Sequence, residues 1–196
     1  MTGDTYYSIA HESSGTYKEK GSKFLAFAFP VNSVEDVRKK LEIVKKKYHD
    51  ARHHCYAYML GRDKKIFRAN DDGEPGHSAG DPILGQIRAK NLSDLLIVVV
   101  RYFGGTKLGV SGLINAYKTA AAEAIAENKI IEKVVTFNVR IDFDYASLND
   151  IMKIVKVYNL AILEQEFHLQ CKLVLSVREK LRDEVLSQLQ KSGTVK

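Results

Sequence analysis

The residues best suited to chemistry lie between positions 52 and 112, in four short groups. Guanidinium and ammonium groups suit anions, carboxylates suit cations, and histidine and serine suit proton transfer or nucleophilic attack. No complete catalytic motif is present, so we assign no catalytic residue. The four groups are Arg52-His53-His54, Asp71-Asp72-Gly73-Glu74, His77-Ser78, and Arg101 with Lys107.

The glycine-rich stretch from Gly104 to Gly112 gives the strongest indication of a binding site. Glycines let the backbone approach a ligand, and the N-terminus of a following helix offers unpaired N–H groups to an anion. Lys107 could add a positive charge, and Ser111 is well placed as a helix cap. Val110 stands where a Walker A loop requires lysine, and a tight turn that packs the helix on a sheet is the alternative. The candidate anion- or RNA-binding residues are Arg52, His53, Arg101, Gly104, Gly105, Lys107, Gly109 and Ser111.

The acidic loop supports more than one explanation. Carboxylates are ligands for Mg²⁺ or Ca²⁺, although the spacing of an EF-hand is absent. The same composition is typical of an exposed turn, and the carboxylates could instead pair with Arg52, Arg88 or Arg101 to fix the loop. A divalent metal therefore stays open, and no other cofactor is expected. The residues assigned to organising this loop, or to a metal, are Asp71, Asp72, Glu74, His77 and Ser78.

Two other kinds of site receive little support. The histidines could bind zinc, but no HExxH helix is present, and adjacent histidines on an alternating strand point to opposite faces. Gly76-His77-Ser78-Ala79-Gly80 has the form GxSxG, yet the nucleophile elbow of a hydrolase follows a strand, and here Glu74-Pro75 precedes it. Local hydrogen bonds from His77 and Ser78 that shape the loop are the simpler explanation.

Hydrophobic periodicity predicts the elements that must position these groups. Leu95 to Val100 is a continuous apolar run, the pattern of a strand covered on both faces. A helix capped by Ser33 should run from Val34 to the lysines at 45–47, and Pro82 could open a second helix. The expected strands are Phe24 to Phe29, His54 to Leu60, Lys64 to Arg68 and Leu95 to Tyr102, and a third helix is expected from Leu113 to Glu127.

The pattern of apolar and polar residues changes after Asn128, which indicates a second domain. The pattern predicts a strand, a helix, two strands and a helix, the split βαβ plan of a ferredoxin-like domain whose last strand is short or missing. We place the domains at residues 1–130 and 131–196. The expected strands are Val134 to Phe143, Ala161 to Glu166 and His168 to Val177, and the helices begin at Ser147 and Arg178.

Composition narrows the class of protein. The chain of 196 residues is 45% hydrophobic, which suits packed cores rather than disorder. Its net charge of +6 suits an anionic partner such as RNA, and equally ordinary solubility. Cys55 and Cys171 form no CxxC pair and are expected to be buried thiols. With no signal-peptide pattern and no apolar run long enough to span a bilayer, a cytoplasmic location is expected.

Four stretches, in this order, together form a specific pattern that resembles the IMPACT family, including its bacterial YigZ members. One departure is His77-Ser78-Ala79-Gly80, where a Thr-Ala-Gly triplet is expected, although serine keeps the hydroxyl. The resemblance covers nearly the whole chain. The stretches are Lys20-Gly21-Ser22-Lys23-Phe24, His53-His54-Cys55-Tyr56-Ala57-Tyr58, Asp71-Asp72-Gly73-Glu74-Pro75, and Arg101 through Gly109.

The resemblance implies both fold and function. It implies an α+β protein whose first domain is similar to domain 2 of ribosomal protein S5 and whose second is ferredoxin-like. The same pairing resembles the last two domains of elongation factor G, which suggests contact with the ribosome or RNA. The eukaryotic relatives regulate translation under amino-acid starvation by binding a protein partner of a kinase. A surface that involves Asp71, Asp72, Glu74, Arg101 and Lys107 is therefore expected to be functional.

We expect a non-enzymatic, translation-associated binding protein that contacts RNA or ribosomes. The alternative is an enzyme acting on a small phosphorylated or carboxylated substrate in the same place, with or without a divalent metal. A protein-interaction module is the third possibility, with exposed apolar residues near Tyr102 and Phe103 as its mark. The expected partners are thus RNA, the ribosome or a protein, and neither membrane nor DNA.

Overall fold

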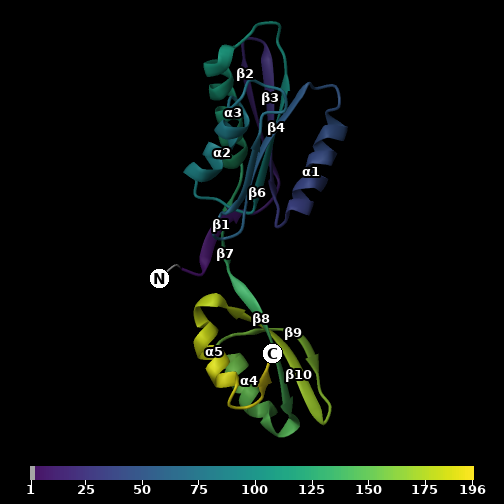
Figure 1. Cartoon of the computed structure of the whole chain (residues 1–196), viewed down its shortest axis with the longest axis vertical. Coiled ribbons are helices and arrows are strands. Elements are labelled where there is room, and N and C mark those ends of the chain that lie inside the picture. The colour runs from purple at the N-terminus through teal and green to yellow at the C-terminus, as the bar shows by residue number, and fades with distance from the viewer. Residues whose placement is uncertain (1–2) are drawn as a thin grey trace. The chain divides into compact units, whose positions relative to one another are not determined.

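The structure is a computed structural model that describes residues 3–196 and divides into two compact units (Figure 1). One unit comprises Tyr6–Lys133, and the other comprises Val134–Lys196 together with residues 3–5. Each unit contains both helices and β-strands. The predicted α+β class with two domains is therefore confirmed.

The first unit is built on a five-stranded antiparallel sheet. Its central strand carries the apolar run from Leu95 to Val100, and all six of these side chains are fully buried. Because alternate residues of a strand point to opposite faces, Ile97 and Val99 lie in one core and Val98 and Val100 in another. The strand order is β2 (Ser13–Glu19), β3 (Ser22–Pro30), β6 (Leu95–Tyr102), β4 (His53–Leu60) and β5 (Ile66–Asn70).

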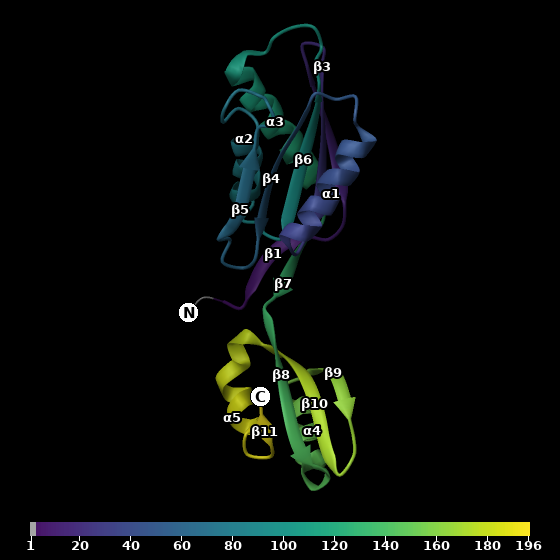
Figure 2. The ribbon, with the colours of Figure 1, turned by 45° about the vertical axis from the view of Figure 1, so that its right-hand side comes forward.

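Helices cover both faces of this sheet (Figures 1 and 2). α1 (Val34–Lys47) packs on one face, and α2 (Gly80–Ala89) and α3 (Gly109–Ala126) pack on the other. The Oγ atom of Ser33 accepts a hydrogen bond from the Asp36 amide, which confirms Ser33 as the predicted cap of α1. The three layers bury every residue of β6 except Tyr102, which is partly exposed.

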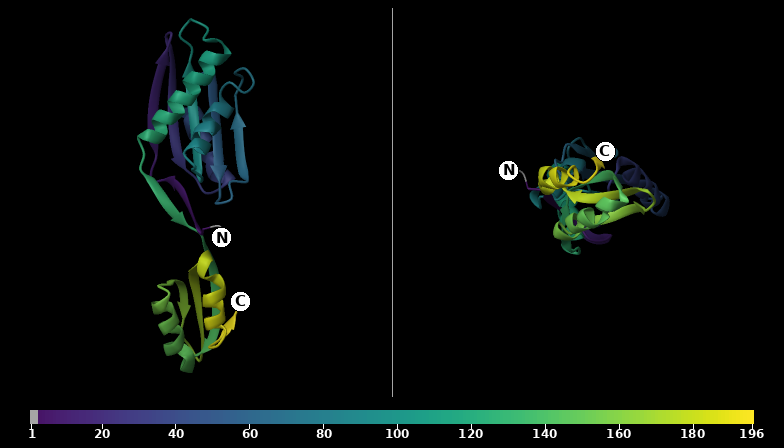
Figure 3. Two further views of the ribbon diagram at one scale, coloured as in Figure 1. Left: turned by 90° about the vertical axis from the view of Figure 1, so that its left-hand side faces the viewer. Right: turned by 90° about the horizontal axis from the view of Figure 1, so that it is seen from below.

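The second unit has the ferredoxin-like chain order βαββαβ. Its apolar core joins both helices to alternate residues of the strands, so the helices cover one face of the sheet, as Figure 3 shows. The last strand, predicted to be short or missing, is the two-residue strand β11, which pairs with β8. The sheet order is β11 (Thr194–Val195), β8 (Thr136–Asp144), β10 (Gln170–Arg178) and β9 (Ala161–Glu166), with helices α4 (Leu148–Val157) and α5 (Arg182–Leu189) and 3-10 turns at Tyr145–Ser147 and Glu179–Leu181.

Two short strands form a separate sheet that the sequence analysis did not predict. β1 (Thr5–Ile9) pairs with β7 (Ile130–Val134). The strand predicted from Val134 to Phe143 corresponds to β8, which begins two residues later, after Val135, whose amide donates to the Asp4 carbonyl (2.7 Å). Within residues 3–196, no helix combines the length and the apolar character needed to cross a membrane.

Candidate functional site

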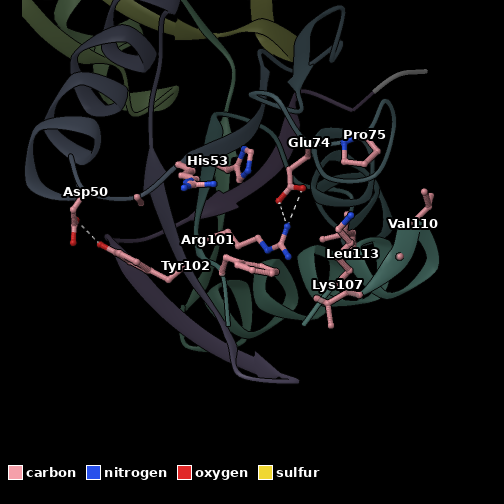
Figure 4. Close-up of a pocket in the computed structure, with 14 residues that line it drawn as sticks. Asp50, His53, Glu74, Pro75, Arg101, Tyr102, Lys107, Val110 and Leu113 are labelled. Carbon is pink, nitrogen blue, oxygen red and sulfur yellow. Dashed lines mark hydrogen bonds and ion pairs between the residues drawn. The ribbon is translucent and has the colours of Figure 1, made fainter. Parts of the chain in front are cut away.

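An open cleft of about 840 Å³ lies where β6 ends and β4 begins (Figure 4). His53, the first residue of β4, pairs with Arg101 near the end of β6. The loop after β6 and the start of α3 form the remaining wall. Five of the eight candidate anion-binding residues line this cleft, namely Arg52, His53, Arg101, Lys107 and Gly109, whereas Gly104, Gly105 and Ser111 are not among the lining residues.

A buried ion pair joins Arg101 to Glu74 in the wall of the cleft (Figure 4). Arg101 Nη1 donates to Glu74 Oε1 and Oε2 at 2.7 and 2.9 Å, and the two side chains are 8% and 4% exposed. The hydroxyl of Tyr117, on α3, donates to the same Oε1 at 2.7 Å. The Glu74 carboxylate is therefore held by two donors from different elements, which anchors the acidic loop to the sheet and to α3.

Two protonated groups complete this buried network. The Cys55 sulfur lies 3.3 Å from the Tyr117 hydroxyl and 3.0 Å from the Asp71 carbonyl. Burial is the main reason that the pKa of the Cys55 thiol and that of the Tyr117 hydroxyl lie well above their ordinary values. Both groups therefore stay neutral near pH 7, and the thiolate that a nucleophilic cysteine needs does not form there.

Asp71 acts as the cap of α2 from a distant position in the sequence. Its Oδ1 accepts from the amides of Ala79 (3.0 Å) and Gly80 (2.8 Å), and its Oδ2 accepts from the His77 amide (2.9 Å). Burial raises the pKa of Asp71, but these three hydrogen bonds outweigh that effect, so the pKa is lowered. α2 consequently begins at Gly80, and the prediction that Pro82 opens it was wrong by two residues.

Asp72 fixes the two histidines at the start of β4. Its Oδ2 accepts from the His54 amide at 2.7 Å, and its carbonyl lies 2.9 Å from Nδ1 of the His53 ring. The His54 ring is buried and its Nε2 lies 3.0 Å from the Tyr48 carbonyl. Only His53 lines the cleft, as expected for neighbours on an alternating strand.

His77 and Ser78 bond locally. The buried Ser78 hydroxyl donates to the Pro75 carbonyl at 2.6 Å, and Nδ1 of the exposed His77 lies 2.6 Å from Asp81 Oδ2. The hydrogen bond with Asp81 raises the pKa of His77. Neither residue lines the cleft. The acidic loop does not converge on a metal either, since residues 3–196 contain no group of three or more His, Cys, Asp or Glu side chains arranged to hold one.

The backbone N–H groups at the start of α3 are not capped by a side chain. The helix begins at Gly109 after Leu108, and its first turn contains no acidic residue. The prediction that Ser111 caps this helix was wrong: because the left-handed backbone at Gly109 (φ 73°) already turns the chain into the helix, Ser111 is the third helical residue and is exposed. Lys107 and Arg52 are exposed, and within the described residues neither forms a hydrogen bond or an ion pair.

Gly104 serves packing rather than ligand approach. A Cβ atom there would lie 1.9 Å from the carbonyl carbon of Gly21, so the loop crosses the turn between β2 and β3 at a distance that only glycine allows. The Gly104 amide also donates to Ser22 Oγ at 3.2 Å. Gly105 and Gly109 have positive φ and open space around them. Close packing of the loop against the β2–β3 turn therefore explains Gly104.

Sequence reasoning missed Tyr117 and Cys55. Tyr117 is fully buried in an alanine-rich helix, and a lone large polar residue on such a face was the available signal. Its partner Glu74 lies 43 positions away, so no local spacing could show their contact. Cys55 gave no signal beyond its expected burial, which the structure confirms together with that of Cys171.

The chain is similar in sequence to a known family of proteins. The model of the Impact N-terminal domain matches residues 20–125. An IMPACT family member from Haemophilus influenzae is 34% identical over 175 residues, covering 87% of this chain and 84% of that protein. YigZ of Escherichia coli is 33% identical over 134 residues, covering 67% of this chain and 66% of that protein.

A solved structure described as a hypothetical protein extends the likeness to both units. It superposes with a TM-score of 0.75 at 25% sequence identity, covering 98% of this chain and 96% of that one. The family match spans every residue that lines the cleft, including those of β4, β6 and the start of α3. The chain belongs to the IMPACT family and is similar to its bacterial YigZ-type members.

Proposed function

We propose that the protein is a non-enzymatic, translation-associated binding protein that contacts RNA phosphates, free or on the ribosome, through the cleft. The single observation that carries this proposal is the pair of exposed cations, Arg52 and Lys107, beside the uncapped start of α3. Cationic side chains and free backbone N–H groups together are the usual binding elements for phosphate.

The charges of the cleft favour an anion. Three cations line it (Arg52, Arg101 and Lys107), and two carboxylates do (Asp50 and Glu74), which leaves one net positive charge. Arg101 is paired with Glu74, and Asp50 accepts a hydrogen bond from Tyr102 at 2.8 Å. Arg52 and Lys107 are thus the cations that a ligand can engage without breaking an existing ion pair.

The link to translation comes from the family. The resemblance to IMPACT proteins implies a role in regulating translation, because the eukaryotic relatives do so, and it suggests the cytoplasm as the location. A binding role rather than catalysis is supported by the state of the nucleophiles, because the Ser78 hydroxyl already donates to Pro75 and burial keeps the Cys55 thiol protonated. No metal or other cofactor is required for it.

Co-sedimentation of the purified protein with ribosomes, at two salt concentrations and with free RNA in parallel, tests the proposal. Binding should weaken steeply as salt rises, because phosphate contacts release counterions. Lys107→Ala should weaken binding and lower the slope of log K against log salt by about 1, the contribution of one phosphate contact.

Lys65→Ala is the matched control. Lys65 lies in the hairpin between β4 and β5, at the opposite end of β4 from His53, and its side chain is 82% exposed. This variant removes the same charge and should keep the wild-type affinity and slope. A protein that sediments with neither ribosomes nor RNA at low salt would contradict the proposal and favour an enzyme for a small phosphorylated or carboxylated substrate.

A further inference from the structure

Phe103 presents an aromatic ring to solvent in the wall of the cleft. The residue directly follows β6, lines the cleft and is 55% exposed. Its ring centroid lies 5.7 Å from Cζ of Arg101, whose guanidinium is in turn fixed by Glu74. A cation held at this distance from an aromatic ring is attracted to the ring by a cation–π interaction. The Phe103 ring is therefore exposed to solvent and lies beside a guanidinium, that of Arg101, whose position is fixed.

The cleft around this ring is partly apolar and concave. Leu108, Val110 and Leu113 line it along with Phe103. Its volume of about 840 Å³ falls within the range of roughly 300–1,000 Å³ that is typical of sites enclosing a small molecule or a single chemical unit. Contact with the outside of a duplex needs charges on a surface, not an apolar hollow. The shape of the cleft thus suits a ligand that inserts a chemical group into it.

A second observation, independent of the helix start, points to a missing acceptor. The Arg101 side chain is 8% exposed, and its buried Nε atom has no hydrogen-bond partner among the described residues. Figure 4 shows this guanidinium in the wall of the cleft, on the side of Lys107 and Leu113. A buried charged donor without an acceptor is rare and costly. Neighbouring atoms cover this Nε, so an oxyanion bound in the cleft would supply that acceptor only once the Arg101 side chain shifts toward it.

We propose that the cleft takes one unit of single-stranded RNA, with a base stacked on Phe103 and the neighbouring phosphate held by Lys107, Arg101 and the start of α3. The inference rests on the proposed function and names the form of RNA that the cleft accepts. Bases of a single strand are free to leave the stack and pack on an aromatic ring, whereas those of a duplex are not. A ring and an anion site in one concave space match one nucleotide.

Fluorescence anisotropy with short labelled oligomers tests this inference. The probes are single-stranded A8, the same ribose-phosphate chain without bases, and the stable self-complementary RNA duplex of (GC)4. Wild type should bind A8 more tightly than either of the others at equal salt. Phe103→Leu should weaken A8 binding about tenfold, since one stacked base accounts for roughly that change, and should leave the base-free chain unaffected. Phe103→Tyr, which keeps the ring, should retain affinity.

Phe67→Leu is the matched control. Phe67 is also exposed (48%), also has an arginine near its ring (Arg88 Cζ at 4.8 Å), and does not line the cleft. It should bind every probe as wild type does. Lys107→Ala should instead weaken binding of all three probes alike, because it removes a phosphate contact and not a base contact.

Three results would overturn the inference. One is equal affinity for A8 and the base-free chain, another is an equal loss on both probes in Phe103→Leu, and the third is displacement of A8 by a phosphoserine peptide at the same concentration as by unlabelled A8. If ribosome binding stays salt-dependent and sensitive to Lys107→Ala in any of these cases, the proposed function stands and only the stacked base is removed. If the wild-type protein binds neither RNA nor ribosomes, both the proposed function and this inference are wrong.

Discussion

At the scale of single residues, the buried pair of Arg101 and Glu74 is the feature on which the cleft depends. Removing one partner of such a pair leaves a buried charge without compensation, which costs about 3–5 kcal/mol. We expect Glu74→Ala to lower the free energy of unfolding by that amount. Urea denaturation followed by circular dichroism measures it, and this probe suits a chain without tryptophan.

Two further variants separate the charge from the volume. Glu74→Leu combined with Arg101→Met should cost less than Glu74→Ala alone, because no unpaired charge remains. Lys153→Ala, which breaks the exposed pair with Asp150 (side chains 74% and 66% exposed), should change the unfolding free energy by less than about 1 kcal/mol. A similar loss for Glu74→Ala and Lys153→Ala would show that the Arg101–Glu74 pair is not buried in solution.

Asp71 makes a pH-dependent contribution whose direction is fixed by its lowered pKa. A carboxylate with a folded-state pKa below its unfolded value of 3.8 stabilises the fold fully above pH 3.8, and this stabilisation is lost as the pH falls through the folded-state pKa. Asp71→Asn should therefore cost about 1 kcal/mol at pH 7, as for a lost helix cap, and much less near pH 2. Urea titrations at both pH values measure the difference.

The exposed Asp63 provides the control for this effect. Asp63→Asn should change stability by no more than about 0.5 kcal/mol at either pH, as is usual for surface positions. A cost for Asp71→Asn that is equal at pH 7 and pH 2 would mean that packing, and not the ionised cap, accounts for it.

Residues of the cleft differed in how far the sequence could place them. Arg101 and Lys107 were predictable, since both are adjacent to features with local signatures, a buried strand and a glycine-rich loop. Ser111 was misassigned because serine near a helix start is a good cap in general, and only the backbone at Gly109 shows where α3 begins. Tyr117 was invisible because its role depends on a contact 43 positions away.

At the scale of elements, the two serines near helix starts give opposite expectations. Ser33→Ala should cost about 1 kcal/mol of unfolding free energy, because the bond that its Oγ accepts from the Asp36 amide is lost at the start of α1. Ser111→Ala should be neutral or slightly stabilising, since alanine is the better helix former at an exposed helical position. Both follow from the same urea titration. Equal costs for the two would restore Ser111 as a cap.

Elements with a strong internal pattern were predictable, and those defined by distant partners were not. The apolar run of β6 and the spacing of α1 predicted both elements closely. β2 was missed because its sequence Ser-Ser-Gly-Thr-Tyr-Lys-Glu is polar, and its place in the sheet comes from pairing with β3 and packing under α3. The start of α2 was misplaced because its cap is Asp71, eight and nine residues before the amides it accepts from.

At the scale of the whole molecule, each unit has an apolar core of its own. Leu173 is fully buried in the core of the second unit, and truncating such a leucine costs about 2–5 kcal/mol. We expect Leu173→Ala to lower the unfolding temperature of that unit, resolved as a separate transition by calorimetry, and to leave the transition of Tyr6–Lys133 in place.

Binding supplies the second readout for this variant. Below both transitions, Leu173→Ala should sediment with ribosomes as wild type does, because every residue that lines the cleft belongs to the other unit. Ile97→Ala, in the core behind the cleft, is the contrasting variant and should lower the other transition. A single transition that shifts as a whole in both variants would show that the two units unfold together.

The burial of β6 on both faces has a kinetic consequence for the cleft. Amide hydrogens of Leu95 to Val100 are shielded by both layers of helices, so they should exchange with solvent only when the whole unit unfolds. The exposed loop after this strand should exchange many times faster. Arg101 and Phe103 are thus attached to the segment that opens last, while Lys107 moves with one that opens often. If RNA binds in the cleft, adding RNA should slow hydrogen exchange at the first amides of α3. Exchange of the β6 amides should not change, so they serve as an internal reference.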